Sequence, residues 1–217
     1  MRDYFNKQLE ELNNEITNMG YLIKNAISEA VDAFIELDER QAKKVIAGDT
    51  EIDHQEKTIE NLCMKLLLKQ QPVAGDLRQI SAALKMITDM ERIGDHAADI
   101  SEIVVTIAEN DHKKHPAHIK IMASETIQML SDCINAYIDK DLVLAKQVIN
   151  QDDVVDDLFN KVKEDIVENI KKADKNSDLM ADYLMVAKYL ERIGDHACNI
   201  SEWVIYSITG EHDENFT

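Results

Sequence analysis

One seven-residue segment occurs twice in this chain. Residues 91–97 read Glu-Arg-Ile-Gly-Asp-His-Ala, and residues 191–197 repeat all seven. The triplet Ile-Ser-Glu follows at 100–102 and again at 200–202. Self-similarity at a fixed spacing is the sequence signature of a duplicated structural unit. We therefore expect the chain to fold as two copies of one supersecondary structure.

A second set of matches lies upstream of each copy. At a spacing of 103, the residues Ala42, Lys43, Val45, Ile46, Asp49 and Asp53 correspond to Ala145, Lys146, Val148, Ile149, Asp152 and Asp156. The change from a spacing of 103 to one of 100 places a three-residue length difference in the connection between the second and third helices of each copy. A polar stretch that ends at Pro116 separates the copies. The predicted organisation is a first repeat at 1–109, a linker at 110–116 and a second repeat at 117–217.

The spacing of apolar residues predicts helices along the chain. Near the N-terminus they recur at alternating steps of four and three, as in a helix of a bundle. These residues are Phe5, Leu9, Leu12, Ile16, Met19, Ile23, Ala26 and Ala30. Helix breakers are rare, with 2 Pro and 6 Gly in 217 residues. We expect an all-α protein made of two tandem, pseudo-symmetric three-helix bundles.

The helix boundaries of the first repeat follow from Gly, Pro and capping residues. The first helix should continue toward Leu37, and a shorter helical stretch should cover 39–47, with a break at Gly48. A second helix should start after Asp49 and end at Gln71-Pro72. A third should begin near Asp76, whose short acidic side chain suits a helix N-terminus, and run to about residue 108.

The charge of the chain excludes some classes of partner. There are 42 acidic and 24 basic residues, a formal net charge of −18, which opposes binding to nucleic acid or anionic lipid. No segment approaches the ~18 consecutive apolar residues of a membrane span. Cys63, Cys133 and Cys198 are odd in number and far apart, so we expect buried, reduced thiols. The predicted location is the cytoplasm, with membrane contact only through a protein partner.

Acidic residues at helical spacing form the candidate site of the first repeat. Residues four apart lie about 40° apart around a helix and roughly 6 Å apart along it. Glu91, Asp95 and Asp99 therefore form one stripe, and Asp49 and Asp53 form another. Each like-charge pair at this spacing destabilises an isolated helix by ~0.2–0.5 kcal/mol. A bound cation would remove this repulsion.

The second repeat carries a similar set. Asp152 pairs with Asp156 and Glu191 with Asp195, while Asn199 replaces Asp99. Oxygen ligands suit hard cations such as Mg²⁺, Mn²⁺, Ca²⁺ or iron, and the residues alone do not choose among them. The alternative without metal is an acidic helix surface that is solvated or forms salt bridges.

Three further residue types accompany the carboxylates. Gly94 and Gly194 indicate a close approach of helices at the level of the acidic stripes. His96 and His196 are candidate ligands, but each lies about 100° around the helix from the neighbouring Asp. That offset favours a role beside the ligands or on the surface. Arg92 and its counterpart are expected to pair with carboxylates or to point to solvent.

Two other classes of protein stay open. A di-metal carboxylate enzyme or metal-storage bundle would use similar residues, but the sequence contains no nucleophile with an adjacent base and no phosphate-cradling glycine loop. A structural helical dimer without metal is the second alternative. We expect a protein that is not an enzyme.

Over nearly its whole length the chain resembles the PhoU family. The resemblance is carried by the two Glu-Arg-Ile-Gly-Asp blocks, the duplicated Asp-x-x-x-Asp stripes and the Pro-Val-Ala-Gly-Asp-Leu-Arg segment at 72–78. It implies two three-helix bundles, each with a metal cluster, often iron or zinc, on its E(D)xxxD motifs. It also implies a negative regulator of phosphate uptake and of the phosphate-starvation response. Its implied partners are the ATPase of the phosphate ABC transporter and a sensor histidine kinase, and we expect a homodimer.

Overall fold

The chain forms six helices in the part that the computed structural model describes, residues 2–69, 72–108, 116–171 and 177–211. No strand occurs within those ranges. The helices are α1 Arg2–Glu36, α2 Glu39–Lys69, α3 Ala74–Ile107, α4 Ile119–Asp139, α5 Leu142–Lys171 and α6 Ser177–Thr209. Residues 110–115 of the predicted linker lie outside the described residues, so the domain boundaries stay a prediction.

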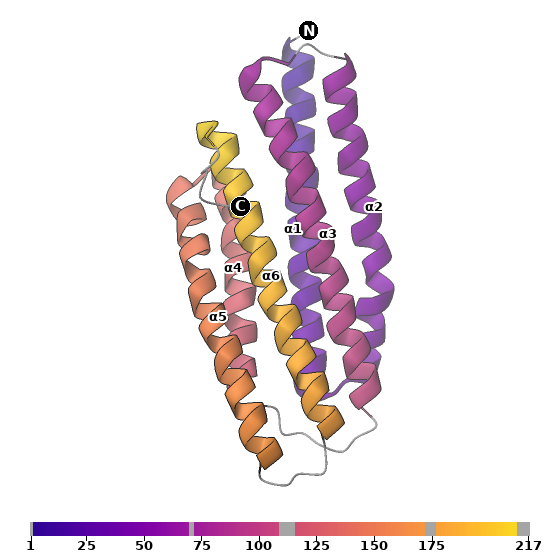
Figure 1. Cartoon of the computed structure of the whole chain (residues 1–217). Helices are drawn as coiled ribbons and strands as arrows, with labels where there is room; N and C mark the ends of the chain where they lie inside the picture. Colours follow the sequence, from indigo (N-terminus) through magenta and orange to yellow (C-terminus); the bar gives the residue numbers. More distant parts are fainter. Residues whose placement is uncertain (1, 70–71, 109–115, 172–176, 212–217) are drawn as a thin grey trace.

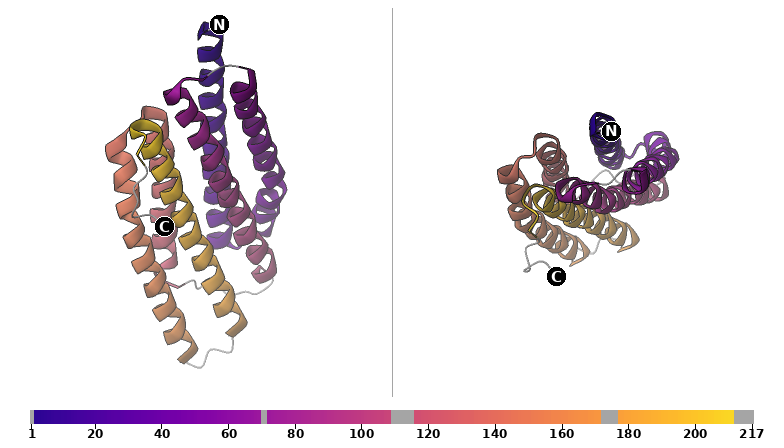
Figure 2. Two further views of the ribbon diagram at one scale, coloured as in Figure 1. Left: turned by 45° about the horizontal axis from the view of Figure 1, so that its top comes forward. Right: turned by 90° about the horizontal axis from the view of Figure 1, so that it is seen from above.

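The helices group into two bundles that lie side by side (Figure 1). Helices α1, α2 and α3 pack together, and so do α4, α5 and α6. The bundles meet chiefly where α3 packs on α6, and also where α1 packs on α4. In the view from above, α2 and α5 lie away from this junction (Figure 2). The predicted all-α fold of two tandem three-helix bundles is confirmed.

Apolar side chains bind the two bundles into one contiguous core. Across the junction the ring of Phe34 meets that of Tyr183 edge to face, with 5.6 Å between centroids. Toward the other end of α1, where it packs on α4, the Tyr137 hydroxyl donates a hydrogen bond to Oδ1 of Asn13 at 2.6 Å. None of the described helices combines the length and apolar character needed to cross a membrane.

The two bundles share the turn that joins their first two helices. Leu37 and Lys140 correspond at the spacing of 103 and adopt left-handed φ values of 55° and 52°. Such a φ costs ~1–2 kcal/mol for a residue with a side chain. The next residues, Asp38 and Asp141, cap the following helix, because Oδ1 of each accepts a hydrogen bond at 3.0 Å from the backbone N–H three residues on.

The predicted break at Gly48 is wrong. The short helical stretch and the helix expected after it are one continuous helix, α2. Ala42, Val45 and Ile52 are buried on the same face across the glycine, and burying a Val or Ile side chain stabilises a fold by ~1.5–3 kcal/mol. A glycine in a helix costs only about 1 kcal/mol relative to alanine. The chain turns instead at Leu37.

Helix α3 begins close to the predicted residue. Its first residue is Ala74, so Asp76 lies within the first turn. Oδ2 of Asp76 accepts a hydrogen bond from the backbone N–H of Val73 at 3.1 Å. The acidic side chain therefore stabilises the helix N-terminus, as its sequence position indicated.

Gly48→Ala should stabilise the protein by about 1 kcal/mol, because the site is helical and no atom lies within 4 Å of the position of the added Cβ. Urea unfolding followed by circular dichroism measures the change. Gly94→Ala is the matched contrast, since its Cβ would lie 2.9 Å from Cδ1 of the buried Ile52. We expect that variant to be destabilised, and equal effects of the two substitutions would contradict this account of α2.

Candidate functional site

In the first bundle, α2 and α3 bring their two acidic stripes together. Gly94 makes this possible, because a Cβ at that position would lie 2.9 Å from Cδ1 of Ile52 on α2, and Oδ1 of Asp49 lies beside it at 3.4 Å. Burial raises the pKa of the Asp49 carboxyl, and the charges of Asp95, Asp53 and Asp99 raise it further. The structure thus places Asp49 of α2 opposite the α3 stripe, as the spacing predicted.

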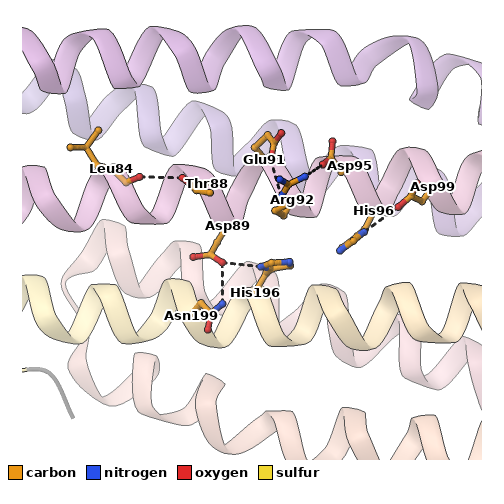
Figure 3. A network of polar contacts seen from close by, with 10 residues as sticks. All are labelled: Leu84, Thr88, Asp89, Glu91, Arg92, Asp95, His96, Asp99, His196 and Asn199. Atoms are coloured by element: carbon orange, nitrogen blue, oxygen red, sulfur yellow. Dashed lines mark hydrogen bonds and ion pairs between the residues drawn. The ribbon is translucent and has the colours of Figure 1, made fainter. Parts of the chain in front are cut away.

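Arg92 partly neutralises the α3 stripe. Its Nη1 donates to Oδ2 of Asp95 at 2.8 Å, and its Nε lies 3.6 Å from Oε2 of Glu91 (Figure 3). Burial raises the pKa of Glu91, as does the charge of Asp95, while Arg92 lowers it. The arginine side chain is 57% exposed, so these ion pairs are screened by solvent and contribute little stability.

Asp99 has a partner outside the stripe. Its Oδ2 lies 3.2 Å from Nδ1 of His96, although its charge still raises the pKa of Asp49. Asn199, at the corresponding place in the second bundle, donates from Nδ2 to Oδ1 of Asp89 on α3 at 3.0 Å. The amide of Asn199 is thus engaged between the bundles, and a metal-ligand role for either residue stays a prediction.

In the second bundle, α5 and α6 repeat the arrangement. A Cβ on Gly194 would lie 3.2 Å from Oδ1 of Asp152. Burial raises the pKa of Asp152 to about 6, helped by the charges of Asp195 and Asp156. That same Oδ1 is buried and has no hydrogen-bond partner. A buried carboxylate oxygen without a donor is unfavourable, and a proton or a cation would satisfy it.

The pKa values of Asp156 and Asp195 also rise. Burial is the main cause for both Asp156 and Asp195, and the charge of Glu191 is the next. The ammonium of Lys188 donates to both carboxylate oxygens of Glu191 and lowers the pKa of the two aspartates. Lys188 therefore places a positive charge within the second carboxylate cluster, which consists of Asp152, Asp156, Glu191 and Asp195.

Three residues near the clusters were missed in the sequence. Glu56 lies one turn beyond Asp53 on α2, and its pKa is raised by burial and by Glu60 and Asp53. Lys188 is the second, and Cys198 is the third. The Cys198 thiol points toward the Val148 carbonyl, with Sγ and O 3.9 Å apart.

An alignment of the two repeats contains the signal that would have found these three residues. Phe159 replaces Glu56 at the spacing of 103, and Thr88 and Ala98 replace Lys188 and Cys198 at the spacing of 100. Cys198 is also only partly buried, unlike the buried Cys63 and Cys133. The thiol pKa of Cys198 is raised by burial and by the charges of Asp152 and Asp195, which puts the thiol beside the second cluster.

Chemically, the two clusters are sets of mutually repelling carboxylates held by helix packing. Such sets take up protons or cations in preference to anions. Within the described residues, no three His, Cys, Asp or Glu side chains are arranged as the ligands of one metal ion. Metal binding therefore stays a prediction at this point.

Comparison with protein families resolves the identity of the repeat. A family model described as the PhoU domain matches the chain twice, at residues 16–104 and 119–204. The chain belongs to the PhoU family. Each matched range contains one carboxylate cluster, and together they contain all ten predicted ligands: Asp49, Asp53, Glu91, Asp95 and Asp99 in the first, and Asp152, Asp156, Glu191, Asp195 and Asn199 in the second.

Relatives within the PhoU family match nearly the whole chain. The "Phosphate-specific transport system accessory protein PhoU homolog" of Clostridium acetobutylicum is 37% identical over 212 residues, which cover 97% of this chain and 96% of that one. The crystal structure of PhoU from Pseudomonas aeruginosa gives a TM-score of 0.91 at 30% identity, covering 95% of this chain and all of the other. The crystal structure of the phosphate transport system regulatory protein PhoU from Streptococcus pneumoniae gives a TM-score of 0.88 at 27% identity. That comparison covers 97% of this chain and 99% of the other. The resemblance recognised in the repeated motif is confirmed.

Asp152 should make the metal-free protein less stable as the pH rises. Its pKa is raised from 3.8 to about 6, so the stability contributed by the protonated carboxyl is complete below pH 3.8 and is lost as the pH passes 6. Asp152→Asn stays neutral throughout. We expect the variant to have a higher Tm than the parent near pH 7 and an equal Tm near pH 4.

Thermal unfolding in the presence of a chelator measures this difference. Asp153→Asn is the control, because Asp153 is the exposed neighbour on the same helix. The account of Asp152 fails if both variants change Tm by the same amount at each pH.

Proposed function

We propose that this protein is a regulatory accessory protein of a phosphate-specific transport system, acting as an adaptor rather than as an enzyme. The observation that carries the proposal is the double PhoU-domain match, one match in each bundle. It is supported by full-length relatives that are named phosphate-specific transport system accessory proteins. In this role the protein represses phosphate uptake and the phosphate-starvation response when phosphate is plentiful.

The proposed partners are the ATPase of the phosphate ABC transporter and a sensor histidine kinase, both reached from the cytoplasm. The shape of the molecule suits two partners, because α2 and α5 lie on the outer sides of the two bundles (Figure 2). Exposed apolar residues occur on each bundle: Met64, Leu68, Val73 and Leu77 at the end where α2 meets α3, and Val143, Val154, Val167 and Ile170 along α5. A net charge of −18 favours basic surfaces on the partners.

We further propose that the two carboxylate clusters bind metal ions, either iron or zinc, with Mg²⁺, Mn²⁺ and Ca²⁺ as alternatives. The chain's own residues fit a cation, because the buried Oδ1 of Asp152 lacks a donor and the pKa values of Asp49 and Asp152 are raised by burial and by neighbouring carboxylates. The ligands would be Asp49, Asp53, Glu91 and Asp95 in the first bundle, and Asp152, Asp156, Glu191 and Asp195 in the second. Arg92 and Lys188 would have to turn away from the clusters. A homodimer also remains a proposal.

The ligand assignment predicts that Asp95→Ala combined with Asp195→Ala lowers the metal bound per chain after reconstitution. Elemental analysis of the purified protein measures the content. Glu51→Ala combined with Asp157→Ala is the control, because both are exposed acids outside the predicted ligand set, on α2 and α5, the helices that pack against α3 and α6. A double variant that retains the full metal complement would show that the ligands lie elsewhere.

The regulatory role predicts that deleting the gene turns on phosphate-starvation genes in phosphate-rich medium. Transcript levels measure this outcome. Affinity purification of the tagged protein should recover the transporter ATPase or the sensor kinase. Normal repression in a deletion strain that has no second PhoU gene would contradict the role, whatever the metal content.

A further inference from the structure

His96 and His196 meet between the two bundles. Each follows the Asp of its cluster by one residue, so each side chain lies about 100° further around the helix. That rotation turns the Asp side chains toward α2 and α5, and the His side chains toward the junction of α3 and α6. The two imidazole rings lie 5.6 Å apart between centroids, with 35° between their planes. The duplicated motif therefore places two equivalent histidines next to each other across the junction.

A carboxylate holds Nδ1 of each ring. Nδ1 of His96 lies 3.2 Å from Oδ2 of Asp99, and Nδ1 of His196 lies 2.8 Å from Oδ1 of Asp89. Asn199 donates to the same oxygen of Asp89 at 3.0 Å and fixes its position. An ionised carboxylate only accepts hydrogen bonds, so Nδ1 carries the proton, and Nε2 of a neutral ring presents a lone pair.

The two lone pairs converge. In Figure 3 the ring edges that carry Nε2 face one another, and the Nδ1 edges are turned away toward the carboxylates. Two acceptors that face each other repel unless a proton or a cation lies between them.

The centroid separation of the two rings, 5.6 Å, is slightly larger than that of two imidazole ligands on one metal ion. With metal–nitrogen bonds of about 2.0–2.1 Å and tetrahedral angles, two imidazole centroids lie about 5–5.5 Å apart. Histidines that bind metal commonly donate their other N–H to a carboxylate, as both histidines do here. Two carboxylates beside two neutral imidazoles would also balance the charge of a divalent ion.

We propose that His96 and His196 form a bis-histidine site for Zn²⁺ or a similar divalent transition-metal ion, which links α3 to α6. The ligand nitrogens belong to neither carboxylate cluster, although Asp99, which contacts His96, is also a predicted ligand of the first cluster. Nitrogen ligands select Zn²⁺, Cu²⁺ or Ni²⁺ over Mg²⁺ and Ca²⁺. The residue His96 is 8% exposed and the side chain of His196 is 22% exposed, so an ion enters from the His196 side and completes its coordination with water.

Electron paramagnetic resonance of Cu²⁺ tests the site, because nitrogen and oxygen ligands give different hyperfine patterns. One equivalent of Cu²⁺ added to the metal-free, full-length protein should give the pattern of two nitrogen ligands. His196→Gln should remove one nitrogen from it. His118→Gln is the matched control and should leave the pattern unchanged, since Nδ1 of His118 also contacts a carboxylate, Oδ2 of Asp165, at 2.9 Å.

Two more variants separate this site from its surroundings. Asp95→Ala combined with Asp195→Ala should keep the two-nitrogen pattern, because it alters only the carboxylate clusters. Asp89→Asn should keep the ligand but weaken Zn²⁺ affinity about 10- to 100-fold, since the ring loses its anchor. Circular dichroism checks that each variant is folded.

The inference is overturned if Cu²⁺ shows only oxygen ligands in the parent protein, the result expected if the two rings merely share a proton. A two-nitrogen pattern that survives in folded His196→Gln would also overturn it. Zn²⁺ should raise the Tm of the parent more than that of His196→Gln, and equal shifts would count against the link between α3 and α6.

Discussion

Helices α3 and α6 each have three faces in use, and the functional residues depend on this packing. One face buries apolar side chains such as Ile93 and Ile193 in the core. A second face carries the glycine and the acidic stripe toward α2 or α5. The third carries the histidine toward the other bundle. The residues of all three faces belong to one seven-residue segment. A sliding movement of α3 or α6 would therefore displace the core residues, the carboxylate cluster and the histidine together.

The magnitudes indicate that packing, and not a bound ion, holds the carboxylates in place. Like-charge pairs one turn apart cost ~0.2–0.5 kcal/mol each, and the partly exposed acids are screened by solvent. Each buried Ile or Leu beside them contributes ~1.5–3 kcal/mol. The helices can therefore keep the acidic residues opposite each other without metal. An ion bound there would act on a fold that is already formed.

The sequence was sufficient for the bundle architecture and for the helical positions of the acidic stripes, because both repeat along the chain. Periodicity failed at Gly48, where buried neighbours on α2 outweigh the intrinsic cost of glycine. Periodicity also left the role of His96 unassigned. An offset of about 100° around the helix gives the direction of the side chain but does not identify the residue that it contacts. That partner, His196, comes from the packing of α3 on α6, which no local pattern encodes. Glu56 and Cys198 were missed for a simpler reason. At each of these positions the two repeats have different residues, and a search for matching residues does not detect them.

Those differences give the two clusters distinct electrostatics. The first gains Glu56, and its adjacent cations are Arg92, whose guanidinium is largely in solvent, and Lys57, whose Nζ lies 4.0 Å from Oδ2 of Asp53 and whose side chain is also exposed. The second has Phe159 in place of Glu56, and Lys188 lies 5.5 Å from the ring centroid while its ammonium contacts Glu191. A cation entering the second cluster would have to displace a lysine from a more buried carboxylate, whereas the basic side chains beside the first cluster are largely in solvent. The duplicated architecture thus presents two unequal electrostatic environments.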